Sequence, residues 1–315
     1  MTDPADNPPA DRPAPHSAAA AYGLLGVVVC FWGVNWPIMK IGLVWLPPFW
    51  FTFLRLGLGA ATLFILLALL GRLRVPPRHD WPMIAVVGTI QIGLFMTLVH
   101  WGLQFVPAGR AALLAYTTPI WVVPGAILFL GERLTALRAL GLLAGLAGLA
   151  VLFNPMSFDW SDVRVVIGNA MLLASALCWA TGIVVVKRHV WRCTPMDAVP
   201  WQLLIAAAIG LVIALAGDSG AAIEWNAGSV LVLLYNGSLA TALAVWAVIS
   251  INRALPAVTT SLAMLGVPAG GLLLSALILD EPVTVSLLLG LMLIAGGVAI
   301  VAWSDRRETL TAPGA

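Results

Sequence analysis

The sequence predicts an all-α integral membrane protein, with ten transmembrane helices arranged as two inverted repeats of five helices. Three observations support this fold class. Of the 315 residues, 61% are hydrophobic and 10% are charged, and mean hydropathy is +1.00, far outside the range of soluble domains. Ten apolar segments are long enough, or nearly so, to cross a hydrocarbon core of ~30 Å as helices. Several residues of the first half recur in the second half at a constant offset.

The ten apolar segments fill most of the chain. We expect helices at residues 21–44, 48–71, 81–106, 109–130, 136–153, 165–186, 198–216, 229–251, 255–279 and 283–303. These segments are continuously apolar rather than alternating with a period of two, which argues against a transmembrane barrel. The first twenty residues are rich in Pro, Ala and Asp and lack the basic start of a signal peptide. We therefore expect a disordered tail followed by an uncleaved first helix.

The recurring residues define the duplication. Six residues recur 149 positions later and two more recur 147 positions later, a difference that one connecting loop absorbs. The pairs are Pro107 with Pro256, Pro119 with Pro268, Glu132 with Glu281, Thr135 with Thr284, Gly141 with Gly290, Gly148 with Gly297, Trp32 with Trp179 and Lys40 with Lys187. Because five helices is an odd number, the second copy must lie upside down in the bilayer. Inverted repeats are typical of secondary transporters, whose substrate site lies between the copies near the midplane.

Basic residues predict the orientation, because short cytoplasmic loops carry an excess of Lys and Arg. With the N-terminus inside, twelve basic residues face the cytoplasm and three lie outside, the latter being Lys40, Arg110 and Arg164. The expected location is the cell (inner) membrane. The expected organisation is a cytoplasmic tail at 1–20, a first repeat at 21–153, an extracytoplasmic linker at 154–164, a second repeat at 165–303 and a cytoplasmic tail at 304–315.

Several function classes find no support in the sequence. The net charge of +2 is too small to indicate nucleic-acid binding, and the basic residues are scattered. Cys30, Cys178 and Cys193 show neither CxxC nor ligand spacing, so we expect no disulfide scaffold and no metal site. An integral membrane enzyme would need a catalytic constellation, and we find no acidic pair, HExxH, Ser/His/Asp set or phosphate loop. A passive channel would need a charged or carbonyl-rich filter motif, and none is apparent in the sequence. We therefore expect a protein that is not an enzyme and uses no cofactor.

Two prolines mark candidate hinges. Pro119 and Pro268 lie near the middle of the fourth and ninth expected helices, where each removes a backbone donor and frees the carbonyl four residues earlier. In lipid such carbonyls need partners, so kinks of this kind usually face protein or a water-filled cavity. A kink that only shapes packing is the alternative. The symmetric placement of the two prolines favours hinges.

Polar and aromatic residues at midplane depth are the natural lining of a cavity, because exposing them to lipid is costly. The amides among them need several partners each, which the carboxylate and ammonium of a zwitterion supply. Deep tryptophans either form apolar or cation–π walls or pack between helices, and both interpretations stay open. The predicted substrate-binding residues are Asn35, Trp36, Gln91, Phe95, His100, Trp101, Tyr116, Trp179, Tyr235 and Asn236.

Ionisable groups bear on energy coupling. No Asp or Glu lies at mid-span, where proton-driven carriers usually place one. Arg55 either reaches the outer interface by snorkelling, with a structural or gating role, or binds an anionic group of the substrate. His100 either titrates near neutral pH or only satisfies a hydrogen bond. Uniport driven by the substrate gradient is the leading mechanism, and proton antiport is the alternative.

Five pieces of sequence carry a resemblance to a known family. They are FWGVNWPIMKIGL at 31–43, Arg55, the run PAGRAALLAYTTP at 107–119, GERLT at 131–135 and DEPVT at 280–284. In this order and spacing they resemble the drug/metabolite transporter superfamily and, within it, the ten-helix EamA-type carriers. The resemblance covers about residues 21–303 and is greatest to YddG-type aromatic amino-acid exporters. It implies a small-metabolite exporter that works by alternating access without ATP.

These observations together predict an exporter of neutral amino acids, aromatic ones included. The expected partners are the small-molecule substrate and the lipid bilayer. A carrier for a different solute, such as a drug, nucleobase or sugar derivative, fits the same fold. Because the duplication supplies both halves of a carrier, a monomer is sufficient, and a dimer stays possible.

Overall fold

Helices form every regular element in the part of the chain that the structure describes. This computed structural model describes residues 18–131, 135–153, 160–254, 264 and 266–311. Within them, eight helical segments are long and apolar enough to cross a membrane. Two shorter apolar helices, Ala136–Val151 and Gly266–Leu279, bring the number to the ten that the sequence predicts. The predicted fold class is therefore confirmed.

The first repeat contains five spans, two of them built from several pieces. Its elements are α1 (Ala18–Gly42), α2 (Pro48–Leu69), η1 (Arg78–Asp80), α3 (Trp81–Val86), η2 (Val87–Leu94), α4 (Phe95–Leu103), α5 (Ala108–Ala115), α6 (Thr118–Leu130) and α7 (Ala136–Phe153). The third span runs from η1 to α4, and the fourth comprises α5 and α6. Helix α1 begins inside the expected N-terminal tail, three residues before the predicted start of the first span.

The second repeat follows the same plan. Its elements are α8 (Val163–Val186), α9 (Pro195–Gly217), α10 (Ala227–Leu234), η3 (Tyr235–Leu243), α11 (Ala244–Ala254), α13 (Gly266–Leu279) and α14 (Val285–Thr311). The third span of this repeat comprises α10, η3 and α11. Helix α14 continues past the predicted end of its span at residue 303 and stays helical to Thr311.

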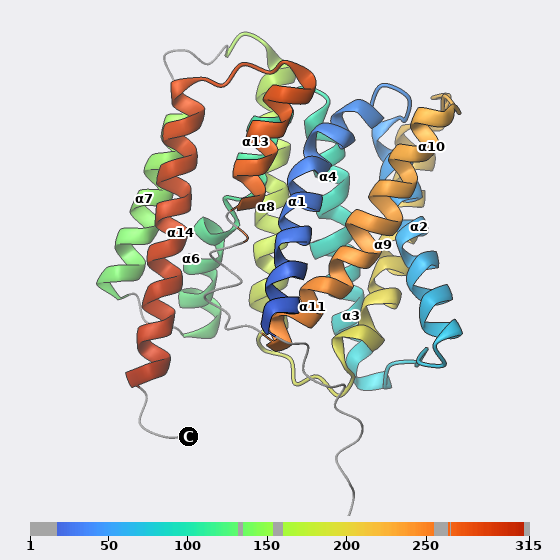
Figure 1. Ribbon diagram of the computed structural model, residues 1–315, viewed down its shortest axis with the longest axis horizontal. Helices are drawn as coiled ribbons and strands as arrows, with labels where there is room; N and C mark the ends of the chain where they lie inside the picture. The colour runs from blue at the N-terminus through green and yellow to red at the C-terminus, as the bar shows by residue number, and fades with distance from the viewer. Residues whose placement is uncertain (1–17, 132–134, 154–159, 255–263, 265, 312–315) are drawn as a thin grey trace, which may run out of the picture.

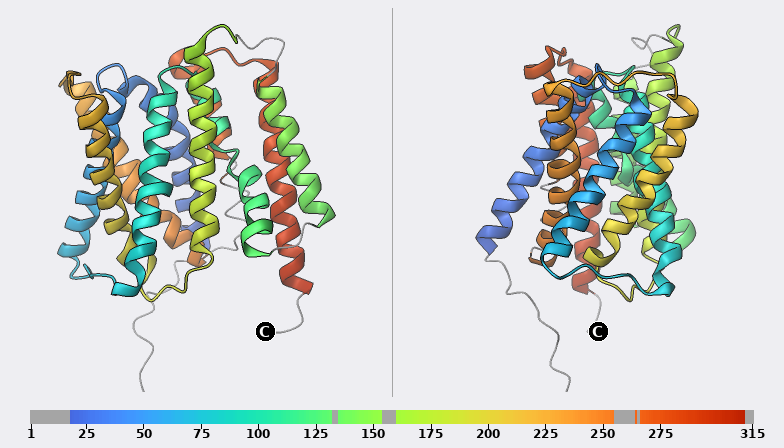
Figure 2. Two further views of the ribbon diagram at one scale, coloured as in Figure 1. Left: turned by 180° about the vertical axis from the view of Figure 1, so that it is seen from behind. Right: turned by 90° about the vertical axis from the view of Figure 1, so that its right-hand side faces the viewer.

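Helices of one repeat pair with helices of the other throughout the molecule. Helix α1 packs against α13, α2 against α9, α7 against α14, and α6 against α8. Helices α7 and α14 stand side by side at one edge of the bundle (Figures 1 and 2). The start of α1 and the end of α14 lie at the same face, which is the lower one in Figure 1. The interface between the repeats therefore runs through the whole bundle.

The third span of each repeat contains a π-helix at the same place. These are η2 and η3, which begin 148 positions apart. Hydrogen bonds in a π-helix reach one residue further than in an α-helix, and such segments occur often at functional sites. Side chains bond carbonyls in η3: Thr241 Oγ1 donates to the Asn236 carbonyl at 2.7 Å, and Trp32 Nε1 donates to the Ala240 carbonyl at 2.9 Å. The sequence analysis expected regular helices here.

The fourth span is broken rather than kinked. Helix α5 ends at Ala115 and α6 begins at Thr118, so Pro119 occupies the start of a helix, where a missing N–H costs little. The freed carbonyl of Ala115 accepts from Thr118 Oγ1 at 3.1 Å. Thr117 Oγ1 donates to the Leu114 carbonyl at 2.7 Å. Pro268 is buried near the start of α13, and most of the segment before α13 lies outside the described residues. The hinge role of both prolines stays a prediction.

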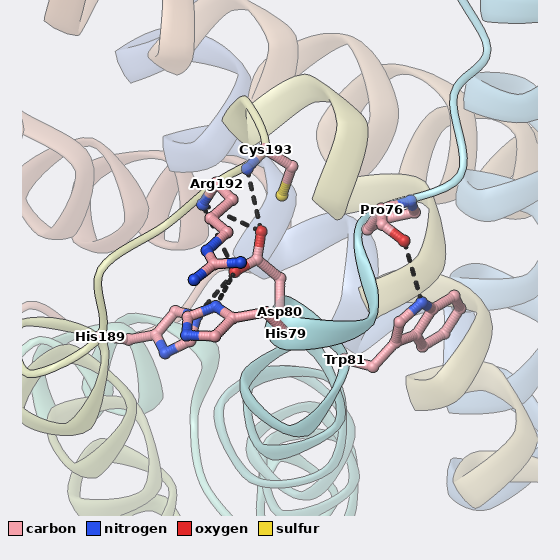
Figure 3. A network of polar contacts seen from close by, with 7 residues as sticks. All are labelled: Pro76, His79, Asp80, Trp81, His189, Arg192 and Cys193. Atoms are coloured by element: carbon pink, nitrogen blue, oxygen red, sulfur yellow. Dashed lines mark hydrogen bonds and ion pairs between the residues drawn. The ribbon is translucent and has the colours of Figure 1, made fainter.

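A buried aspartate joins loops of the two repeats (Figure 3). Asp80 is fully buried at the end of η1. Its Oδ1 lies 3.0 Å from His79 Nδ1 and 2.8 Å from His189 Nε2. Its Oδ2 accepts from the backbone N–H groups of Arg192 at 3.1 Å and Cys193 at 2.9 Å. We call His79, Asp80 and His189 the Asp80 cluster.

Glycine allows α7 and α14 to touch at the backbone. A Cβ atom on Gly141 would lie 2.7 Å from the Gly297 carbonyl oxygen, and one on Gly297 would lie 2.5 Å from the Gly141 carbonyl oxygen. Both distances are too short for a real Cβ, so a side chain at either position would force the helices apart. Small residues commonly bring membrane helices together in this way. The neighbouring Gly296 has no atom within 4 Å of a Cβ built on it.

This crossing gives a test with a matched control. We expect Gly297→Ala to destabilise the protein by about 1–3 kcal/mol, because backbone lies on the other side of the contact and cannot give way. Gly296→Ala should leave the stability unchanged or raise it slightly, since Ala has the higher helix propensity. Thermal unfolding of the purified variants in detergent measures both. Equal Tm values for the two variants would show that the helices do not cross as described.

Candidate functional site

A cavity of about 350 Å³ lies between the two repeats. The first repeat lines it from α1, α2, α4, α5 and α6, and the second from α8, α14 and Met264. Its aromatic and polar lining consists of Trp32, Asn35, Trp36, Arg55, Phe95, Tyr116, Thr118 and Trp179. Methionines and aliphatic residues complete the wall. This is the place where an inverted-repeat carrier binds its substrate.

Aromatic rings form much of the wall. Phe95 of α4 and Trp179 of α8 meet with ring centroids 4.8 Å apart and planes tilted by 56°. Trp36 of α1 is only 5% exposed. Trp32, one turn earlier, is held by its bond to η3. These rings come from both repeats, so an apolar or aromatic group in the cavity would contact both halves of the protein.

Arg55 brings a buried positive charge to the cavity. The residue is 2% exposed, so it does not snorkel to the interface, and that interpretation of the sequence is wrong. Its Nε donates to Thr241 Oγ1 at 3.1 Å, and its Nη1 lies 2.8 Å from Met39 Sδ. Among the described residues no carboxylate forms an ion pair with it. Buried charges are normally paired, so this guanidinium has capacity for an anionic group.

Asn35 supplies an acceptor with no partner. The residue is 5% exposed, and its Oδ1 is a buried atom without a hydrogen bond. Leaving such an acceptor unsatisfied costs about 1–3 kcal/mol. A ligand that donates a hydrogen bond, such as an ammonium group, would remove that cost. Asn35 and Arg55 together therefore offer one acceptor and one cation in a cavity lined mainly by aromatic and aliphatic residues.

Half of the predicted binding residues line this cavity. They are Asn35, Trp36, Phe95, Tyr116 and Trp179, and the candidate hinge Pro119 joins them. The sequence analysis did not include Arg55 among its binding residues, and it missed Met39, Met96, Met264 and Val298 altogether. Methionine and valine carry no chemical signal that distinguishes a cavity wall from ordinary helix packing.

The other five predicted residues lie outside the cavity lining. Gln91 packs against Gly182 of α8. His100 is fully buried, where Nδ1 lies 2.8 Å from Thr52 Oγ1 and the ring stacks on Phe51. Trp101 is 36% exposed and meets Phe49 edge to face. The Tyr235 hydroxyl donates to the Phe31 carbonyl. Asn236 Nδ2 donates to the Val232 carbonyl.

Lys40 and Glu281 tie helices together at the face opposite the chain ends. Lys40 Nζ donates to the carbonyls of Leu103, Gln104 and Val106, at the end of α4. Glu281, in the turn between α13 and α14, accepts from the backbone N–H groups at the start of α5 at 2.6 and 2.9 Å. Cations at helix C-termini and anions at helix N-termini are both favoured by the helix dipole. We call these two sets of bonds the Lys40 and Glu281 contacts.

Comparison with known families identifies this architecture. A sequence profile of the EamA-like transporter family matches residues 19–154 and again residues 166–303. The chain belongs to the EamA-like transporter family. The two matches fall on the two repeats, so each repeat is one family unit. It is thus a multi-pass membrane protein of a transporter family in the drug/metabolite transporter superfamily.

Two relatives of this EamA-like transporter align over more than nine-tenths of their own length. The uncharacterized transporter YvbV of Bacillus subtilis is 30% identical, with 92% of this chain and 94% of the relative covered. A probable amino-acid metabolite efflux pump of Escherichia coli is 28% identical, with 87% and 92% covered. A solved crystal structure superimposes with a TM-score of 0.64 at 22% identity, covering 94% of this chain and 99% of that chain. The last comparison shows a shared fold.

Whether the Lys40 contacts of this EamA-like transporter hold one face of the cavity closed can be tested by substitution. Charge-assisted hydrogen bonds contribute about 1.5–3 kcal/mol each. If the Lys40 contacts keep the cavity closed at this face, Lys40→Met should raise the fraction of molecules whose cavity is open at this face about tenfold or more. A cysteine placed at Asn35 in a background without native cysteines reports that opening. It should react faster with a polar thiol reagent added at this face.

The matched control is Lys187→Met, which removes the equivalent lysine of the other repeat, at the opposite face. It should leave the reaction from the first face no faster than in the parent. If Lys40→Met left the labelling rate unchanged as well, the Lys40 contacts would not hold this face closed.

Proposed function

We propose that this protein exports neutral amino acids, aromatic ones included, through the cavity between its two repeats. Two groups in the aromatic cavity carry the proposal: Arg55, a buried cation that forms no ion pair with a carboxylate among the described residues, and Asn35 Oδ1, which has no hydrogen bond among them. An amino acid carries a carboxylate, an ammonium and a side chain. Each of the three finds a complementary group in the cavity.

The carboxylate binds Arg55 in this proposal. A guanidinium presents several donors in a planar fork that matches a carboxylate, and the burial of Arg55 strengthens the attraction. The ammonium donates to Asn35 Oδ1 and faces the rings of Trp36 or Tyr116 through cation–π contacts. The side chain lies against Phe95 and Trp179. At about 350 Å³ the cavity is at the small end of ligand pockets, which suits one amino acid.

The name of the Escherichia coli relative supports the same substrate class, because that protein is a probable amino-acid metabolite efflux pump. Within the superfamily we propose that the chain acts as a YddG-type exporter. A carrier for a drug, nucleobase or sugar derivative remains the alternative. The lining favours amino acids, since an uncharged solute would leave the Arg55 charge without a partner.

Transport proceeds by alternating access in this proposal. Breaking the Lys40 and Glu281 contacts opens the cavity to one face, and re-forming them closes it. In this proposal the chain ends face the cytoplasm and those contacts lie at the outer face, an orientation that the twelve basic residues against three favour. One chain in the cell membrane supplies both halves of the carrier.

Uniport is the proposed mode of coupling. The described cavity lining contains no Asp, Glu or His. None of these lining side chains can therefore carry a proton together with the substrate. His100 is not part of the lining, and its ring contacts Thr52 and Phe51 instead. The substrate gradient then drives export without a co-transported proton.

Counterflow in proteoliposomes tests the proposal. Vesicles preloaded with unlabelled tyrosine or leucine should accumulate the labelled amino acid without a pH gradient. Arg55→Gln should reduce this uptake at least about 100-fold, because losing one partner of a buried ion pair costs about 3–5 kcal/mol. Arg55→Lys should retain part of it. Tyramine, which is tyrosine without the carboxylate, should not exchange.

Arg164→Gln is the matched control, since Arg164 is exposed at the start of α8, away from the cavity. It should exchange as the parent does, and the Tm of each variant establishes folding. Exchange of tyramine at the rate of tyrosine would contradict the role of Arg55. Absence of counterflow for every amino acid, with uptake of another solute from a panel, would assign the cavity to that solute.

A further inference from the structure

The Asp80 cluster brings three metal-ligating side chains together outside the cavity. His79 and Asp80 belong to the loop before α3, and His189 belongs to the loop between α8 and α9. The ligand atoms of the three residues all lie within 4.8 Å of one another. His189 lies 109 positions from Asp80, so no sequence spacing motif marks the cluster. The sequence analysis expected no metal site, because the cysteines show no ligand spacing and the chain contains no HExxH motif.

Two of the three ligand-atom distances in the cluster are close to those of a first coordination shell. His79 Nδ1 and His189 Nε2 lie 3.0 and 2.8 Å from the same oxygen, Asp80 Oδ1. Ligands bonded to one ion at about 2.0–2.2 Å lie roughly 3.0–3.5 Å from each other when they are neighbours around it. The two imidazole rings stack with centroids 4.8 Å apart, so both nitrogens approach the oxygen from one side. The ligand atoms are separated by up to 4.8 Å, so the two histidine nitrogens must move roughly 1 Å toward each other to share one ion.

The surroundings hold the carboxylate in place. Asp80 Oδ2 accepts from the backbone N–H groups of Arg192 and Cys193, which fixes the carboxylate plane and leaves Oδ1 toward the histidines. Metal sites commonly hold their ligands through such outer contacts. Asp80 is fully buried, whereas the side chain of His79 is 41% exposed. The cluster is therefore rigid on the aspartate side and accessible on the histidine side.

We propose that His79, Asp80 and His189 bind one divalent transition-metal ion of the zinc type. Two imidazoles and one carboxylate suit zinc, cobalt and nickel, and they suit calcium and magnesium poorly because those ions require mainly oxygen ligands. Water completes the coordination on the exposed side. The ion joins the α2–α3 loop of the first repeat to the α8–α9 loop of the second.

Positive charge nearby opposes the ion. Figure 3 shows the Arg192 side chain beside the cluster, and Arg78 and Arg188 adjoin its members in the sequence. The ionised Asp80 offsets one charge of the metal, and the remaining charge is repelled by these guanidinium groups. Removing the Arg192 charge should therefore tighten metal binding, while the backbone N–H of that residue continues to hold Asp80.

Zinc titration of the intact protein tests the proposal. Full-length protein without a histidine tag, purified in detergent, is titrated with zinc in a calorimeter. We expect one ion per chain and a higher Tm with zinc than without it, because an ion that binds only the folded state stabilises it. Calcium should give neither signal. Arg192→Gln should lower the Kd for zinc.

Two substitutions locate the ion. His79→Gln and His189→Gln each keep a side-chain N–H for Asp80 but remove a metal ligand. Each should weaken zinc binding at least about 100-fold, since even outer-shell partners cost about 10- to 100-fold. His16→Gln, at a histidine outside the described residues, is the matched control and should bind as the parent does. Zinc binding unaffected by the first two substitutions, or absent from the parent protein, would overturn the proposal.

Discussion

The hydrocarbon core offers no hydrogen-bond partner, and this constraint determines where the helices can break. Backbone groups released inside a membrane must be satisfied by the protein itself. The two breaks next to the cavity meet that requirement with side chains: Thr117 and Thr118 bond the carbonyls at the end of α5, and Trp32 and Thr241 bond carbonyls in η3. Thr241 Oγ1 also accepts a hydrogen bond from Arg55 Nε. One of these groups, Thr241, thus also positions the charge in the cavity.

Duplication supplies the second constraint, because every helix of one repeat has its partner in the other. Where paired helices meet through small residues, as at Gly141 and Gly297, they approach to backbone contact and leave no space. Where large aromatic residues meet across the repeats, as Phe95 and Trp179 do, their rings form part of the cavity wall. The wall therefore contains residues from both copies.

The number, order and inversion of the helices followed from hydropathy and a fixed offset, which are properties of the sequence. The rotation of each helix about its own axis, which decides which side chains face the cavity, did not follow from these two properties. Asn35 and Trp36 line the cavity, whereas Tyr235 and Asn236, chosen by the same criteria, bond the carbonyls of Phe31 and Val232. Both lie in the π-helix η3, whose wider turns change which residues share a face. A rule based on regular helices cannot place them. Arg55 was misjudged because sequence distance from the helix end says nothing about neighbours that bury it.

The two repeats differ at the start of their third spans, and the difference explains why the Asp80 cluster exists on one face only. Asn226 precedes α10 and forms a capping box with Ser229, so its side chain serves its own helix. Asp80 stands in the same position before α3 but makes no cap to that helix. Both of its oxygens bind elsewhere, and four of the five bonds cross to the other repeat. An aspartate released from capping thereby links the repeats at the face of the chain ends. At the opposite face, Lys40 and Glu281 bind carbonyl and amide groups at helix ends instead. The two faces are therefore tied by chemically different contacts, and among the described residues only the Asp80 cluster brings three metal-ligating side chains together.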